Sequence, residues 1–479
     1  MGTVTINSVT INGQSFRGYG PFTNNNQIVS VDLQGVNWTT NSMRNAFTWC
    51  NNLHTVSNLP NTVVNLDYTF YWCRNLVNAP EIPNSVITMK DTFTNTNLVT
   101  TPVIPNSVTD MSYTFDQCHM LENILPLPSF LICMQRTFSY CENLVNAPII
   151  PNSVTNMEQT FLGCSKLASV PIIPYSVKTL YDTFRGCSNL TGEAYIYSTD
   201  IGSAFNCFAT SNLSRMINVY IPYNASLGIY TLTYNTFANA GYTPSTTKDG
   251  VTIKENPNFE KYGDWWYCNH DGVIHKYLGS SIPTNLAIPN SINGKSTSIY
   301  GYRLFYYDYG IINGNTMTKI DMNNVLLYGS LEYAFGWCQN ANITNLRISD
   351  TVTNMSYAFI GCNNLTEIPT LPTQITDLSH AFEGCWNLPA PPNMINCKAL
   401  RLMTMAFHAT NLIGNFYIGS EQIISAESAF YFGSGVKNVY IPFRYANGEY
   451  TQTYNTMLNY GYTTTGTKHN VYLKDLATL

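Results

Sequence analysis

The chain repeats one pattern of residues with a period close to 23. Phenylalanines recur every 22 or 23 residues in a first series and every 23 to 25 residues in a second. The first series is Phe47, Phe70, Phe93, Phe115, Phe138, Phe161 and Phe184, and the second is Phe335, Phe359, Phe382 and Phe407. A fixed period of this length indicates a repeat protein, in which each repeat contacts only its neighbours along the chain.

A common string surrounds most of these phenylalanines. Examples are VTDMSYTFDQC at residues 108–118 and VTNMSYAFIGC at residues 352–362, and a link such as NAPIIPNS then leads to the next Val. One period is too short for two long helices, and Val and Thr bounded by Pro favour extended structure. We therefore predict a β-rich leucine-rich-repeat solenoid in which each period forms one coil, with two extended pieces, an aromatic corner and turns.

Stacked coils place residues of the same phase over one another, about 4.8 Å apart. We therefore predict a buried structural ladder made of Phe47, Cys50, Phe70, Cys73, Phe115, Cys118, Phe138, Cys141, Phe161, Cys164, Phe184, Cys187, Phe335, Cys338, Phe359, Cys362, Phe382 and Cys385. Ten of the 13 cysteines fall at or near the position three residues after a Phe, including Cys207, two residues after Phe205. Because stacked side chains point in parallel directions, we expect free thiols rather than disulfides.

The two arrays of repeats end in matching segments. NVYIP at residue 218 leads to TYNTFANAGYT, and NVYIP at residue 438 leads to TYNTMLNYGYT. We predict matching C-terminal caps, each covering a last coil. In the first cap we expect a helix closed by Gly241 that buries Tyr234 and Phe237.

These patterns predict the following division of the chain. It comprises an N-terminal β cap or docking segment with hairpin-like alternation (1–30), a first array (31–217), a first capping module (218–254), a β-rich connecting insert with several tyrosines (255–319), a second array (320–437) and a second capping module (438–479).

The pattern VTxMxxTFxxCxNL, followed by xxxPxIPNS, resembles the BspA-like family of leucine-rich repeat surface proteins, in its Met-Phe-Cys variant. The resemblance extends over residues 31–217 and 320–437. It implies action by binding rather than by catalysis, as in bacterial cell-surface adhesins and related proteins of gut microbes and their phages. The sequence shows no cationic and apolar leader and no wall-anchoring tail, which favours a phage virion component over an exported protein.

Composition excludes several partners. Charged residues make up 11% of the chain, against roughly 25% in typical soluble domains, and the net charge is -5. Lys and Arg are scattered, so we expect no nucleic-acid binding, and without a long apolar run we expect no membrane insertion. Aromatic residues at 13%, beside neutral amides and hydroxyls, suit glycans or another protein's surface.

No motif predicts catalysis, a metal or a cofactor. Cys268, His270, Asp271 and His275 have loose metal-ligand spacing, but no closing ligand is near, so we expect an ordinary polar loop. Five further histidines occupy unrelated phases of the repeat, outside any nucleophile motif: His54, His119, His380, His408 and His469. We therefore predict that the protein is not an enzyme and has no catalytic residue, metal site or cofactor.

The candidate ligand-binding residues are Trp49, Trp72, Tyr140 and Trp337. They occupy the position just before the ladder Cys, where other coils carry Gly163, Gly186, Gly361 or Gly384. If Phe and Cys point inward, this position points outward, so the rings form platforms for sugar rings and the glycines leave room for a ligand chain. The alternative is that these rings pack under a loop or under the N-terminal cap.

We therefore predict a non-enzymatic binding or structural protein, namely a phage tail-fibre or virion surface component that recognises a host surface glycan or protein. One alternative is a virion decoration or scaffold protein that contacts other virion proteins. Another is a bacterial cell-surface adhesin. We expect a homo-oligomer located in the virion and made in the host cytoplasm, with the bacterial cell surface as the alternative location.

Overall fold

A computed structural model describes residues 4–5, 10–11, 20–38, 41–209, 217–279, 283–301, 304–305, 317–431, 435–445, 450–465, 468 and 471–478. The chain forms two compact units, Met1–Pro257 (unit 1) and Asn258–Leu479 (unit 2). Each unit has its own hydrophobic core. The six segments expected from the sequence, with their bounds, remain predictions.

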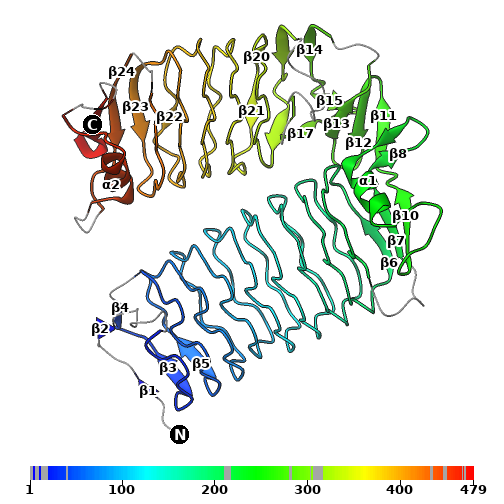
Figure 1. The fold of residues 1–479 in the computed structure, drawn as a ribbon, viewed down its shortest axis with the longest axis vertical. Helices are drawn as coiled ribbons and strands as arrows, with labels where there is room; N and C mark the ends of the chain where they lie inside the picture. Colours follow the sequence, from blue (N-terminus) through cyan, green and yellow to red (C-terminus); the bar gives the residue numbers. More distant parts are fainter. Residues whose placement is uncertain are drawn as a thin grey trace. The chain divides into compact units, whose positions relative to one another are not determined.

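The described part of unit 1 consists of short strands and one helix (Figure 1). Its elements are β1 (Val4–Thr5), β2 (Thr10–Ile11), β3 (Ser30–Asp32), β4 (Asn37–Trp38), β5 (Thr55–Ser57), β6 (Gly192–Tyr195), β7 (Ile217–Ile221), β8 (Tyr223–Asn224), β9 (Ile229–Tyr230), α1 (Leu232–Asn239) and β10 (Val251–Glu255).

The described part of unit 2 likewise consists mainly of short strands. Its elements are β11 (Phe259–Tyr262), β12 (Trp265–Cys268), β13 (Val273–Tyr277), β14 (Asn285–Ala287), β15 (Ser291–Ile292), β16 (Lys295–Ser296), β17 (Ser298–Tyr300), β18 (Lys319–Asp321), β19 (Leu326–Tyr328), β20 (Asn342–Thr344), β21 (Arg347–Ile348), β22 (Asn393–Met394), β23 (Ile413–Ile418), β24 (Gly435–Ile441), α2 (Gln452–Asn459), β25 (Tyr472–Asp475) and the 3-10 helix η2 (Leu476–Thr478).

Successive coils pair in parallel, but the sheets are small. The orders β1-β3-β5, β10-β7-β6, β14-β18-β20 and β22-β23-β24-β25 follow the stacking of coils. Between β5 and β6 the coils meet through single parallel bridges, such as Asp110 with Cys133 and Asn156 with Thr179. The part of the chain that the structure describes is thus the β-rich repeat fold with few helices that we predicted, but its strands form separate sheets and not a closed solenoid.

The described strands near the N-terminus do not pair as the hairpin that their alternation resembles. Strand β1 pairs in parallel with β3, and β2 pairs in parallel with β4. A hairpin would require antiparallel pairing of adjacent strands. These strands instead add to the next coil, as strands of the repeat do.

Each coil turns tightly around its ladder Phe. The residues two positions before and two positions after it adopt left-handed φ, as in Tyr113 (60°) and Gln117 (59°) around Phe115. The N–H of Phe115 donates to the Thr137 carbonyl of the next coil (3.0 Å), and the N–H of Gln117 donates to the Ser139 carbonyl (2.7 Å). The coils are thus joined by backbone hydrogen bonds even where no strand forms. We call these five-residue segments, taken over all coils, the turn strip.

The core of each unit is a column of stacked rings. From Phe47 to Phe184, successive ladder rings have centroids 5.4–5.8 Å apart and interplanar angles of 14° or less. Phe335, Phe359, Phe382 and Phe407 stack in the same way in unit 2. All ladder residues predicted from the sequence are 1% exposed or less.

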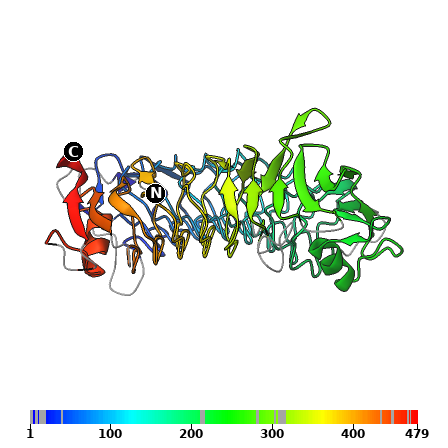
Figure 2. The ribbon, with the colours of Figure 1, turned by 90° about the horizontal axis from the view of Figure 1, so that it is seen from above.

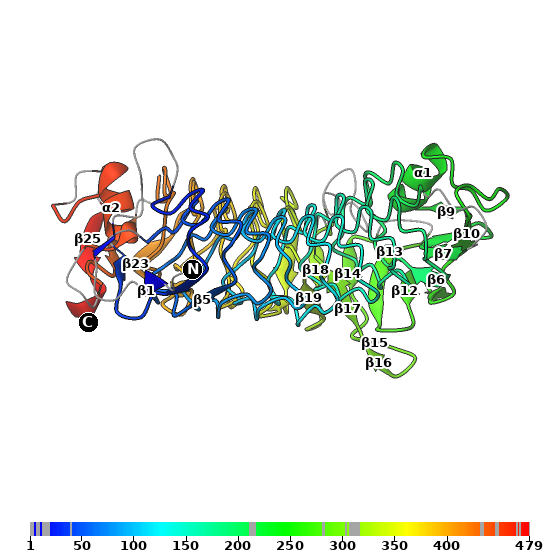
Figure 3. The same ribbon diagram turned by 90° about the horizontal axis from the view of Figure 1, so that it is seen from below.

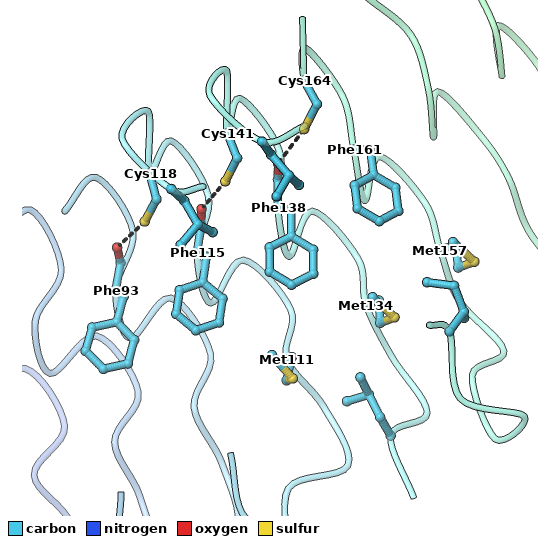
Figure 4. Packing of buried hydrophobic residues seen from close by; sticks show 14 of the residues in the cluster. Phe93, Met111, Phe115, Cys118, Met134, Phe138, Cys141, Met157, Phe161 and Cys164 are labelled. Atoms are coloured by element: carbon cyan, nitrogen blue, oxygen red, sulfur yellow. Dashed lines mark hydrogen bonds between the residues drawn. The ribbon is translucent and has the colours of Figure 1, made fainter. Parts of the chain in front are cut away.

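The ladder cysteines are free and hydrogen-bonded. The Sγ of Cys118 donates to the Phe93 carbonyl of the preceding coil (3.1 Å), and that of Cys164 donates to the Phe138 carbonyl (3.0 Å), as Figure 4 shows. Burial raises the pKa of Cys118 to about 12. These thiols therefore remain protonated, and each serves as a small buried donor between two coils.

The interpretation of Cys207 as a ladder cysteine is wrong. Phe208 stacks on Phe184 (5.4 Å), whereas Phe205 is 54% exposed. Cys207 takes the place of the Thr that precedes the Phe in other coils, and its carbonyl accepts from the N–H of Phe184 (2.8 Å). The step from Phe184 to Phe208 is one residue longer than the period, so the phase shifts by one. Phe22, Phe305 and Phe430 extend the two columns further.

The predicted helix is confirmed as α1. The Thr231 hydroxyl accepts from the N–H of Tyr234, and Gly241 follows the helix with a φ of 87°. Phe237 is fully buried and Tyr234 is partly buried against the core. Helix α2 repeats this design with Thr451 at its start, Gly461 after its end and Met457 buried. Figure 2 shows α2 beside the C-terminal strand of unit 2.

Candidate binding site

The position two residues after each ladder Phe, which precedes the ladder Cys where one is present, has a left-handed backbone conformation in every coil from Phe47 to Phe184 and from Phe335 to Phe407. We call these positions the slot row. The φ angle is 62° at Trp49 and Trp72, 55° at Tyr140 and 65° at Trp337. The other members of this slot row are Asn95, Gln117, Gly163, Gly186, Gly361, Gly384 and Ala409, all with φ between 55° and 79°. Glycine adopts this conformation freely, whereas bulky residues are strained in it by about 1–3 kcal/mol.

Three of the four predicted ligand-binding rings lie at the surface. Trp49 is 39% exposed, Tyr140 41% and Trp337 42%. Trp72 is partly buried, and the Arg74 guanidinium lies 4.5 Å from its ring centroid. The preceding coil bonds to the backbone next to Trp49, where the Asn24 N–H donates to the Thr48 carbonyl (2.7 Å), and the Trp49 ring itself is exposed.

The glycines of the slot row make room for neighbouring rings. A Cβ placed on Gly163 would lie 2.5 Å from Cδ1 of Tyr140, and one placed on Gly361 would lie 2.6 Å from Cε3 of Trp337. Each ring therefore lies over the glycine of the next coil. The prediction that the glycines leave room for a ligand chain is wrong at these two positions, because the ring of the preceding coil fills that space.

A second glycine follows in both units. A Cβ on Gly186 would be 3.3 Å from the Gly163 Cα, and a Cβ on Gly384 would be 3.6 Å from the Gly361 Cα. The same arrangement therefore occurs in both units: an exposed ring is followed by glycine at this position in the next two coils. It consists of Tyr140, Gly163 and Gly186 in unit 1 and of Trp337, Gly361 and Gly384 in unit 2. We call it the aromatic-glycine step.

In unit 1, the row two positions before the ladder Phe combines aromatic and charged groups. The guanidinium of Arg136, in this row, lies 5.4 Å from the ring centroid of Tyr113, and that of Arg44, one position before the row, lies 4.9 Å from the ring centroid of Tyr68. Burial raises the pKa of Asp91 in the same row to about 6. The arginines and Asp91 thus interact with tyrosines of this row, and the slot row beside it is neutral.

In unit 2, the turn strip brings two histidines onto one carboxylate. The Nδ1 of His380 lies 2.5 Å from one Glu383 oxygen, and the Nδ1 of His408 lies 3.2 Å from the other. Tyr333, Tyr357 and His380 stack with centroids 4.6 and 4.5 Å apart. Our statement that these histidines have unrelated phases missed the cluster. Aligning the residues that follow Phe382 and Phe407 reveals it, because Glu383 and His408 share a phase.

The loose metal-ligand pattern of the insert lies partly on paired strands and partly in the turn between them. His270 and Asp271 lie in an exposed turn, as the predicted polar loop requires, but Cys268 and His275 do not. Cys268 ends β12, and His275 lies on β13 with its ring 4.8 Å from that of Phe259. Burial lowers the pKa of His275 to about 3. Among the described residues, no group of three His, Cys, Asp or Glu side chains is placed to hold a metal ion. His469 and the tyrosines Tyr302, Tyr306, Tyr307 and Tyr309 of the insert lie outside the described residues.

Within the part of the chain that the structure describes, no helix has the length and apolar character needed to cross a membrane.

Comparisons with known proteins bear on the repeat. The family model for the BspA type leucine rich repeat region matches six copies, over residues 3–122, 40–168, 112–242 and 331–456. One similar solved structure is a leucine-rich repeat protein from Bacteroides ovatus, with 15% identity over 98% of this chain and 91% of that chain, and a TM-score of 0.34. Another is a leucine rich cell surface protein from Faecalibacterium prausnitzii, with 18% identity over 94% and 93%, and a TM-score of 0.24. No curated protein matches the chain. Because the family model covers well over half of the residues, the chain belongs to the BspA-type leucine-rich repeat family.

Proposed function

We propose that this chain is a non-enzymatic binding protein of the bacterial cell-surface type, which contacts its partner through the turn strip. The aromatic-glycine step carries the proposal. In each unit an exposed aromatic ring occupies a left-handed position, where its backbone is strained and where it adds nothing to the buried ladder. Strained surface positions of this kind concentrate at functional sites.

A neutral glycan is the partner that the slot row suits. In unit 1 the row continues from Tyr140 to Gln117 and Asn95, and the Asn95 amide donates to the Gln117 carbonyl oxygen (3.1 Å). A ring stacks on the apolar face of a sugar, and the amides exchange hydrogen bonds with its hydroxyls. The row contains no charged side chain among the described residues, so an uncharged ligand fits it.

A second part of the proposal concerns the helices at the ends of the two Phe columns. Phe237 of α1 packs against Phe208 (6.5 Å), and the Nζ of Lys248 donates to the last helical turn at Ala240. Lys468 makes the same bond to Tyr460 after α2. We propose that α1 and α2 cap two arrays, since each covers the last rings of a column. A virion component and a homo-oligomer remain predictions from the sequence.

The experiment is binding of the labelled full chain to intact gut bacteria, with competition by their isolated surface polysaccharides. Trp337→Gly and Tyr140→Gly remove the rings and suit the left-handed backbone. Trp386→Ala is the matched control, because Trp386 is exposed but lies outside the slot row. We expect saturable binding that the polysaccharides compete and that the two Gly variants weaken at least about tenfold, or 1.4 kcal/mol. Equal weakening by Trp386→Ala, or no weakening by either Gly variant, would contradict the proposal.

A further inference from the structure

Unit 2 contains a cleft of about 620 Å³ outside the turn strip. This volume lies within the range of roughly 300–1,000 Å³ that is typical of small-molecule sites. Its lining consists of Asn290, Ser291, Ser296, Thr297, Ser298, Asn323, Asn324, Leu326 and Arg347. Figure 3 shows the β15-β16 hairpin, which forms one wall, projecting from the strands around β17.

The floor of the cleft is one row across three parallel strands. Ser298 of β17 pairs with Leu326 of β19, and Leu326 pairs with Arg347 of β21. Residues in register on neighbouring strands project to the same face of a sheet. The floor therefore presents a hydroxyl, an apolar side chain and a guanidinium side by side.

Two turns with specific hydrogen bonds form the walls. Thr297 closes the base of the hairpin, where its N–H donates to the Asn290 carbonyl (3.0 Å). Opposite it, Asn323 and Asn324 adopt left-handed φ of 48° and 58°. The Asn323 N–H donates to the Asp321 carboxylate (2.9 Å), which holds this turn in place.

The side chains around the cleft have unused hydrogen-bonding capacity. Among the residues that the structure describes, no protein partner is found for the hydroxyls of Ser291, Ser296 and Ser298, the side-chain amides of Asn290 and Asn324, or the guanidinium of Arg347. These donors and acceptors around one cleft are suited to a ligand rich in hydroxyl groups.

The positive charge of Arg347 in the cleft favours a ligand with an anionic group. Arg347 is exposed, and no carboxylate belongs to the lining. The adjacent acid, Asp321, is engaged by the Asn345 amide (2.7 Å), the Asn323 N–H and Lys319 (3.5 Å). A free guanidinium binds a carboxylate through two parallel hydrogen bonds.

We propose that this cleft binds a sugar residue that carries a carboxylate. The carboxylate pairs with Arg347, the sugar hydroxyls bond to the serines and asparagines, and the apolar face of the ring lies on Leu326. The site is distinct from the slot row, so it neither requires nor follows from the binding function proposed above.

The test is titration of the full chain with glucuronic acid, and with glucose as the uncharged match, followed by ligand-detected NMR at millimolar sugar. We expect saturable binding of glucuronic acid and at least tenfold weaker binding of glucose. Arg347→Gln should remove this preference, and Arg347→Lys should restore only part of it, because an ammonium cannot form the paired bonds. Asn324→Gly removes an amide while keeping the left-handed turn, and it should weaken both sugars.

Lys295→Gln is the control for net charge, since Lys295 lies on the same hairpin but donates to the Asn269 carbonyl outside the lining. It should leave binding of glucuronic acid unchanged. The proposal is overturned by three results: no saturable binding of glucuronic acid, equal binding of both sugars, or equal losses in Arg347→Gln and Lys295→Gln. A Trp337→Gly variant that loses polysaccharide binding but still binds glucuronic acid would separate the two sites.

Discussion

The position before the ladder Phe differs between the two units. Unit 1 has Ala46 before Phe47 and Thr before its other six ladder Phe residues, at Thr69, Thr92, Thr114, Thr137, Thr160 and Thr183. Unit 2 has Ala at Ala334, Ala358, Ala381, Ala406 and Ala429. Both sets are buried. In unit 1 each hydroxyl donates to a carbonyl of the preceding coil, as Thr137 does to Met111 (2.9 Å). Unit 2 stacks its rings equally well without these bonds, so the Phe column and the backbone bonds suffice to form the fold, and the Thr row adds to its stability.

The turn strips differ more than the interiors. Unit 1 places arginines over tyrosines, whereas unit 2 stacks tyrosines on a histidine. Yet both keep an exposed ring followed by two glycines. The repeat therefore preserves its core and one surface feature while other surface side chains vary, which is the pattern expected of a scaffold that presents binding residues.

The largest expected effect comes from removing a ring from one column. Phe138→Ala should destabilise unit 1 by about 3–5 kcal/mol, and Phe359→Ala should do the same to unit 2, because each leaves a large cavity in a stacked core. Since each unit has its own core, hydrogen exchange should show the loss only in the unit that carries the change. Loss of protection in both units from either variant would break the comparison, because it would mean that the two cores unfold together.

The glycines of the slot row should differ by position and not by unit. Gly163→Ala and Gly361→Ala each force a ring to move and strain the backbone, with an expected cost of about 1–3 kcal/mol. Gly186→Ala and Gly384→Ala meet no ring and should cost about 1 kcal/mol, mainly from backbone strain, with a tight contact to the Gly163 Cα added at Gly186. Urea denaturation measures these differences. Adding Trp337→Gly to Gly361→Ala should recover the part of the lost stability that comes from the clash with the ring. If no stability is recovered, Trp337 does not lie over Gly361.

Unit 1 should also respond to pH through Asp91. Burial raises its pKa to about 6, so the folded unit binds this proton more tightly than the unfolded chain does. The resulting stability is fully present below the unfolded pKa of about 3.9 and is lost as the pH rises through about 6. We expect the free energy of unfolding of unit 1 to fall by about 1–2 kcal/mol between pH 5 and pH 7, and we expect Asp91→Asn to abolish that fall. Unit 2 has Tyr, His, Met or Ser at this phase, so the same slope in unit 2 would contradict the assignment to Asp91.

Periodicity predicted the interior because ladder residues depend only on their own repeat. Gly241 and the spacing of Tyr234 and Phe237 likewise predicted α1 from local residues, whereas the Thr231 cap was found only in the structure. The failures have a different origin. Phe208 was missed because one extra residue shifted the phase, and the role of Gly163 was missed because it depends on a ring from another coil. The cleft beside Arg347 combines a hairpin, a turn and three strands from separate segments, none of which shows a repeated pattern.

The smallest expected effect tests the Thr row itself. Thr137→Ala removes a hydroxyl that donates to Met111, while the Met111 carbonyl keeps its bond from the Thr114 N–H (3.1 Å). Because that carbonyl remains satisfied and unit 2 tolerates Ala at this phase, the cost should be about 1 kcal/mol rather than that of an unsatisfied buried group. Thr137→Ser keeps the hydroxyl and should retain most of the stability in urea denaturation. If Thr137→Ser loses as much as Thr137→Ala, the methyl group rather than the hydrogen bond distinguishes the interior of unit 1 from that of unit 2.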